Sequence, residues 1–128
     1  MLWFSCSLPV LMTSLLQWSA AQLSVSPDVV TLAVGETVTL SVGYTGRVRY
    51  FNWFRGAGTD ADEHILGVFG SAPPAHGPRY TGREAALPDG SLRIRDVQTD
   101  HTGTYTVQMY TDQGGLRDTT AQLRVYGK

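Results

Sequence analysis

The sequence is short of cysteine and of charge, and both shortages exclude classes of function. Its 128 residues include one cysteine, Cys6, and carry a formal net charge of −1 without any run of basic residues. Phosphate binding requires clustered lysine and arginine side chains, so nucleic acid is not expected as a partner. No second apolar segment follows the first 21 residues, which themselves contain no acidic or basic side chain.

Residues that would support catalysis or metal binding are also missing. His64, His76 and His101 have no metal-ligand spacing, and the acidic loop at 60–63 lacks the alternation and the glycine of a calcium loop. There is no Gly-x-Ser-x-Gly elbow and no phosphate-binding loop. The sequence therefore predicts a protein that is not an enzyme, with no cofactor, metal or small-molecule substrate.

The first 21 residues have the features of a secretory signal. Leu8–Leu16 is an apolar run too short to cross a bilayer, and the small residues Ser19, Ala20 and Ala21 follow it. We therefore expect a signal peptide over 1–21 and a mature domain over 22–128. The alternative is a signal anchor, since the segment lacks the usual basic n-region. Cleavage would remove Cys6 and leave an extracellular domain without cysteine.

The rest of the sequence alternates apolar and polar residues in short runs separated by turn residues, which is typical of strands. Strands are expected at 23–25, 29–34, 37–42, 48–55, 65–69, 80–87, 91–94, 104–111 and 116–126. Asp89-Gly90 and Asp112–Gly115 predict two tight hairpins, because these residues tolerate positive φ. Ser71–Pro78 is rich in proline and glycine and predicts a crossover without a strand. No helical window longer than one turn is present. The pattern favours an all-β sandwich of about nine strands.

Four residues make this sandwich an immunoglobulin variable-type domain. Trp53 lies eleven residues after Val42, and Tyr105 lies two residues before Val107. This spacing matches the buried tryptophan, the tyrosine corner and the two cysteine positions of such domains. Valine occupies both cysteine positions, so the sequence predicts an immunoglobulin V-type β-sandwich that lacks the inter-sheet disulfide. We expect Val42, Trp53, Tyr105 and Val107 to form its core.

Four short segments in this order resemble one family. They are Gln22–Val25, Tyr80–Glu84, Leu87–Leu92 and Thr102–Gln108. Together with the disulfide-free core they are similar to the N-terminal variable-type domain of the carcinoembryonic-antigen-related cell adhesion molecules and of the related pregnancy-specific glycoproteins. The resemblance covers the whole predicted mature domain. The first domain of the CD2-like receptors, which also lacks a disulfide, is an alternative.

The resemblance implies cell adhesion or immune recognition through the sheet of strands G, F, C and C′. The implied partners are proteins at a cell surface, either a second copy or a related receptor, and bacterial adhesins in some members. The matching positions here are Arg49, Phe51, Asn52, Phe54, Thr59, Asp60, His64, Gln108 and Tyr110. Strand alternation independently predicts that Asn52, Phe54, Gln108 and Tyr110 point outward if Trp53 and Val107 point inward. Phe54 and Tyr110 are the expected apolar anchors.

Other features leave the choice of partner open. Arg49 stands where adhesive members often have an apolar residue, which weakens the case for homophilic pairing, so at most a weak homodimer is expected. A secreted immunomodulatory or matrix-assembling protein is the alternative function. The predicted location is the cell surface if the domain belongs to an anchored chain, and the extracellular medium otherwise.

Asn52 is the only asparagine and Trp-Phe follows it, so there is no N-glycosylation sequon. His101 replaces the aspartate that pairs with the residue matching Arg83 in the family.

Overall fold

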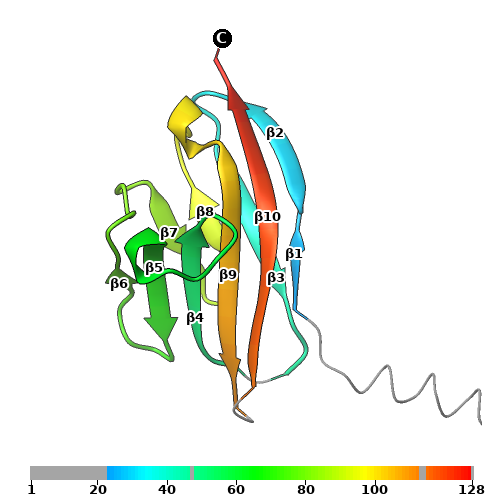
Figure 1. Ribbon diagram of the computed structural model, residues 1–128, viewed down its shortest axis with the longest axis vertical. Helices are drawn as coiled ribbons and strands as arrows, with labels where there is room; N and C mark the ends of the chain where they lie inside the picture. Colours follow the sequence, from blue (N-terminus) through cyan, green and yellow to red (C-terminus); the bar gives the residue numbers. More distant parts are fainter. Residues whose placement is uncertain (1–22, 47, 113–114, 128) are drawn as a thin grey trace, which may run out of the picture.

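The computed structural model describes residues 23–46, 48–112 and 115–127. They form the predicted all-β sandwich, with two sheets packed face to face (Figure 1). The strands are β1 (Ser24–Ser26), β2 (Val29–Ala33), β3 (Val38–Gly43), β4 (Val48–Arg55), β5 (His64–Phe69), β6 (Ala75–His76), β7 (Glu84–Ala86), β8 (Leu92–Ile94), β9 (Gly103–Thr111) and β10 (Leu116–Tyr126). Two three-residue 3-10 helices, η1 (Ala61–Glu63) and η2 (Thr99–His101), complete the order.

The larger sheet has six strands in the order β2-β10-β9-β4-β5-β6, and the smaller has four in the order β1-β3-β8-β7. The first predicted strand is split between them. β1 pairs antiparallel with β3, whereas β2 pairs parallel with β10 after the chain turns at Pro27. β1 and β2 therefore follow one another along one edge of the molecule in Figure 1 while belonging to different sheets.

Both predicted hairpins are present. β9 and β10 pair from Gly103 to Leu123, and β7 and β8 pair across the turn that contains Gly90. Gly90 has φ +91°, and its carbonyl accepts a 2.8 Å hydrogen bond from Trp53 Nε1. A Cβ at Gly90 would collide with the Phe51 ring, so the turn needs glycine for both its dihedral angle and its closeness to the core. The expectation of no strand in Ser71–Pro78 is wrong in one detail, because Ala75–His76 pairs briefly with β5.

The core lies between the two sheets where a disulfide would otherwise join them. Trp53, Tyr105 and Val107 are fully buried there, and Val42 is half-buried at its margin. Tyr105 Oη donates a 2.7 Å hydrogen bond to the His101 carbonyl, which is the geometry of a tyrosine corner. Apolar packing and the buried Trp53–Gly90 hydrogen bond hold the two sheets together without a covalent bridge.

The predicted signal peptide over 1–21 lies outside the described residues. Among the described segments, no helix has the length and apolar character needed to cross a membrane.

Candidate protein-binding face

An apolar row crosses the outer face of the six-stranded sheet. We call its four residues, Phe69, Tyr50, Tyr110 and Leu116, the aromatic ladder. They come from β5, β4, β9 and β10 and are direct cross-strand partners in that order. The Tyr50 ring lies 4.6 Å from the Phe69 ring and 5.0 Å from the Tyr110 ring, centroid to centroid. Phe69 and Leu116, at the two ends, are 52% and 50% exposed.

A polar row lies beside the aromatic ladder, two residues further along each strand. Asn52 pairs with Gly67 on β5 and with Gln108 on β9, and Gln108 pairs with Asp118 on β10. Residues two apart on a strand point to the same side, so the two rows share one face. The face thus combines an apolar stripe with a neighbouring row of amide and carboxylate groups.

Next to the polar row, His64 is held in a fixed position. Its Nε2 donates a 2.8 Å hydrogen bond to Asn52 Oδ1, and its ring lies 5.2 Å from the Phe54 ring. The bond requires Gly67, because a Cβ there would collide with Asn52 Oδ1, and a Cβ at Gly77 would likewise collide with His64. Partial burial lowers the pKa of His64 below 6.5, and a hydrogen bond with the Leu66 backbone opposes this shift in part.

Phe54 does not offer the exposed anchor that strand alternation predicts. It is on the outer side of β4 but only 6% exposed, with the His64 ring against it. A β-bulge changes the register here, so that Trp53 faces Leu66 and Phe54 faces His64, with Ile65 between them. Phe51 points the other way, since it packs against the hydrophobic core beside Gly90.

Three more of the predicted residues lie away from the aromatic ladder or at its edge. Thr59 and Asp60 are exposed in the loop before η1, beyond the far end of β4 from Tyr50. Arg49 is exposed where the register of β4 against β9 shifts between Val48 and Tyr50. Because of that shift, Tyr50 and not Arg49 is the neighbour of Tyr110.

The structure therefore brings together Asn52, His64, Gln108 and Tyr110 from the predicted set and adds four residues that sequence reasoning missed. These are Tyr50, Phe69 and Leu116 of the aromatic ladder and Asp118 of the polar row. Tyr50 could have been found from its even spacing to Asn52. Phe69 and Leu116 stand at strand ends, where alternation alone does not distinguish a face residue from a turn residue.

The family model of the immunoglobulin V-set domain matches residues 25–126. The chain belongs to the immunoglobulin V-set family. Its relatives include cell adhesion molecule CEACAM16 of Rattus norvegicus, 33% identical over 84% of this chain, and that of Mus musculus, 32% identical over 97%. Cell adhesion molecule CEACAM15 of Mus musculus is 31% identical over 96% of this chain. The resemblance to the carcinoembryonic-antigen-related family is thereby confirmed.

This V-set domain covers only part of those relatives. It spans 26% and 28% of the two CEACAM16 proteins and 55% of CEACAM15. Among solved structures, murine CEACAM1b has the same fold, with a TM-score of 0.74 and 24% identity over 84% of this chain and 54% of that one. A chain from a mouse coronavirus receptor-binding domain complexed with its murine receptor has a TM-score of 0.70 and 27% identity over 84% of this chain and 54% of its own.

The V-set domain departs from the family's expected ion pair at His101. Arg83 instead lies 3.8 Å from Asp96, and His101 is buried with its Nε2 3.9 Å from the carboxylate of Glu84. The Glu84 carboxylate accepts hydrogen bonds from the Thr81 backbone N–H and hydroxyl, and His101 Nδ1 accepts one from the Gln98 N–H. His101 and Glu84 thus lie side by side in the interior, but His101 Nε2 has no hydrogen-bond partner among the described residues. In the described part of the chain, no group of three metal-ligating residues could hold a metal ion.

Proposed function

We propose that this V-set domain is the recognition module of an extracellular adhesion protein and binds protein partners through the aromatic ladder and the adjacent polar row. The observation that carries the proposal is the aromatic ladder itself. Four large apolar side chains form a continuous stripe on an outer sheet face, and its two ends, Phe69 and Leu116, are half exposed. A contiguous exposed apolar stripe bordered by polar groups is typical of a protein-binding surface.

The two rows would have different roles in binding. Tyr50 and Tyr110 are rigid because they stack on one another, so they would lose little side-chain freedom on association and serve as anchors. Asn52, Gln108 and Asp118 would select the partner through hydrogen bonds at the edge of the contact. Self-pairing through one such face would give a two-fold symmetric dimer, weak in solution and strengthened by many copies at a surface.

The relatives support a role in adhesion, since CEACAM16 and CEACAM15 are named as cell adhesion molecules. A similar chain takes part in a complex with a viral receptor-binding domain. The proposed partners are therefore surface proteins: a second copy, a related immunoglobulin-domain receptor, or a microbial adhesin. The proposed location is extracellular, at the cell surface in an anchored protein and in the medium otherwise.

Sedimentation of the purified protein across a concentration series tests self-pairing. The expected result is a concentration-dependent dimer that Tyr110→Ala abolishes and Tyr126→Ala preserves. Tyr126 is 53% exposed on the same sheet but ten residues along β10 from Leu116, so it is a matched control. A cell-adhesion assay tests binding to a different protein. Cells that display this chain, or its Tyr110→Ala or Tyr126→Ala variant, are mixed with cells that lack it, and the attached cells are counted. Equal effects of the two variants in both assays would refute binding through the aromatic ladder.

A further inference from the structure

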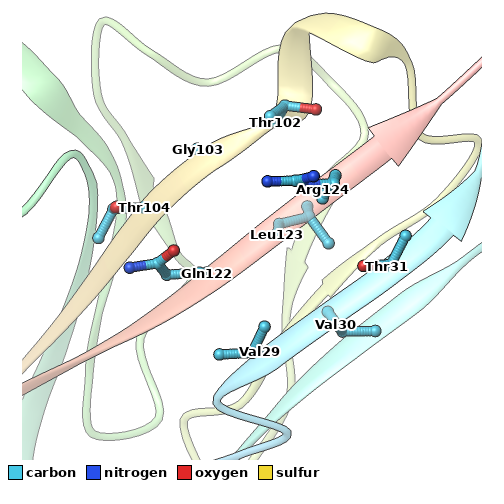
Figure 2. Close-up of a pocket in the computed structure, with 9 residues that line it drawn as sticks. All are labelled: Val29, Val30, Thr31, Thr102, Gly103, Thr104, Gln122, Leu123 and Arg124. Carbon is cyan, nitrogen blue, oxygen red and sulfur yellow. The ribbon is translucent and has the colours of Figure 1, made fainter.

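A small hollow opens on the other end of the same sheet, where β2, β10 and β9 lie side by side (Figure 2). Its volume is about 240 Å³. Five polar side chains line it, and four of them come from strands: Thr31 from β2, Thr104 from β9, and Gln122 and Arg124 from β10. Drug-sized ligands usually occupy about 300–1,000 Å³, so the hollow suits something smaller.

These four side chains have no hydrogen-bond or ion-pair partner among the described residues. Most described arginines are occupied: Arg55, Arg83 and Arg95, for example, bind carbonyl or carboxylate oxygens. Arg124 does not, and Figure 2 shows its guanidinium extending over β10 toward Gly103. Thr102 also lines the hollow, but its hydroxyl already has partners. It accepts a hydrogen bond from the Val125 N–H and donates one to the Val125 carbonyl.

Gly103 lines the hollow with its backbone alone. It adds no side chain to the floor, and its φ of +144° favours glycine. A Cβ there would lie 3.4 Å from Arg55 Nη2. Arg55 Nη2 donates to the carbonyls of Asp100 and Thr102, each at 3.1 Å, and the Arg55 guanidinium lies over the buried Tyr105 ring. Arg124 is the one charged residue among those that line the hollow, and it is free to form new hydrogen bonds.

We propose that this hollow binds a single carboxylate-bearing sugar residue, such as the acidic end of a glycan chain. The Arg124 guanidinium would hold the carboxylate through two parallel hydrogen bonds. Gln122, Thr31 and Thr104 provide amide and hydroxyl groups that match sugar hydroxyls. Val29, 67% exposed at the rim, provides an apolar surface for the C–H side of the ring. The volume fits one ring and leaves the rest of a chain in solvent.

Asp28 opposes this binding and therefore provides a test of its charge dependence. It precedes Val29, and its backbone carbonyl accepts a 2.8 Å hydrogen bond from the Gln122 N–H, which makes it the acidic residue next to the hollow. Removing its charge with Asp28→Asn should strengthen the binding of an anionic ligand severalfold. The same change should leave the binding of a neutral sugar unaltered.

The experiment titrates the ¹⁵N-labelled protein with the methyl glycosides of N-acetylneuraminic acid and of glucuronic acid, and follows amide chemical shifts. Methyl galactoside and sodium acetate are the neutral-sugar and bare-carboxylate controls. The expected result is saturable shifts at Gly103, Thr104, Gln122 and Arg124 with at least one acidic sugar. Arg124→Gln should weaken this binding about tenfold or more. Arg124→Lys should weaken it less, because lysine keeps the positive charge but cannot form the two parallel hydrogen bonds. Arg93→Gln is the matched control, since Arg93 is exposed, has no hydrogen-bond or ion-pair partner among the described residues and lies in the other sheet.

Three results would overturn the proposal. They are the absence of saturable shifts with both acidic sugars at millimolar concentration, equal shifts with sodium acetate, and equal weakening by Arg124→Gln and Arg93→Gln. None of them bears on the aromatic ladder, because that row lies at the opposite end of β9 and β10. The glycan site and the proposed protein-binding face can therefore fail separately.

Discussion

Tyr50 and Tyr110 stack across β4 and β9 with ring centroids 5.0 Å apart and planes inclined by 19°. Aromatic cross-strand pairs stabilise a sheet by about 0.5–1.5 kcal/mol beyond the area that they bury. In a double-mutant cycle of Tyr50→Ala and Tyr110→Ala, we expect a coupling free energy of about 1 kcal/mol from urea unfolding. Tyr126→Ala should change stability by about 0.5 kcal/mol or less. Strict additivity of the two tyrosine variants would contradict the stacking.

The partial burial of His64 predicts a loss of stability in mild acid. Desolvation lowers the pKa of His64 in the folded protein below its ordinary value of 6.5. Below that value the unfolded chain binds a proton more readily than the folded chain, so folding is weakened as the pH falls. We expect the melting temperature to drop between about pH 7.5 and 5.5, and to drop less in His64→Gln, which cannot titrate there. Because His76 and His101 are present in both proteins, equal drops would remove His64 as the cause.

Gly67→Ala tests how closely β5 approaches Asn52. The new Cβ would collide with Asn52 Oδ1 and displace it from His64. We expect a loss of about 1–3 kcal/mol in unfolding free energy, as is usual for overpacking. Gly58→Ala is the matched control, because a Cβ there meets nothing within 4 Å and should change stability by about 0.5 kcal/mol or less. Similar effects of the two substitutions would mean that Asn52 moves without penalty.

The tyrosine corner predicts a distinct response to alkali. Burial raises the pKa of Tyr105 from 10.0 to about 12. Between these values the unfolded chain loses the phenolic proton first, so stability falls as the pH rises, by at most about 3 kcal/mol. Tyr105→Phe should remove this part of the pH dependence. At neutral pH it should reduce stability by about 1–3 kcal/mol, because the buried His101 carbonyl loses its donor.

Tyr126→Phe is the control for that measurement, since Tyr126 is 53% exposed whereas Tyr105 is fully buried. Urea unfolding at neutral and at alkaline pH gives both quantities. A Tyr105→Phe protein with the same alkaline dependence as the wild type would contradict the assignment.

Much of this fold could be predicted from side-chain alternation and turn residues within short segments. The range Val48–Arg55 was predicted without error for β4, and the hairpins at Gly90 and at 112–115 followed from turn chemistry. These features depend on side-chain alternation and on residues that tolerate positive φ, which are properties of short segments. The valines at 42 and 107 likewise indicated a core without a disulfide.

The binding face could be predicted only in part, because two register shifts decide which side chains reach it. The shift between Val48 and Tyr50 places Tyr50 beside Tyr110, whereas Arg49, one of the positions that the resemblance implies, lies outside the aromatic ladder. The bulge between Trp53 and Phe54 sets His64 against Phe54, which is then buried although it points outward. Alternation predicts the side of a strand but not what covers it.

The sequence by itself determined the sandwich, most of its strands and its disulfide-free core, since each follows from periodicity and spacing along the chain. Only the tertiary structure decided that Phe69, Tyr50, Tyr110 and Leu116 form one row and that Thr31, Thr104 and Arg124 surround one hollow. Both sites join residues from strands far apart in sequence. Their meeting depends on strand pairing and register, which are set by the packing of the whole sheet.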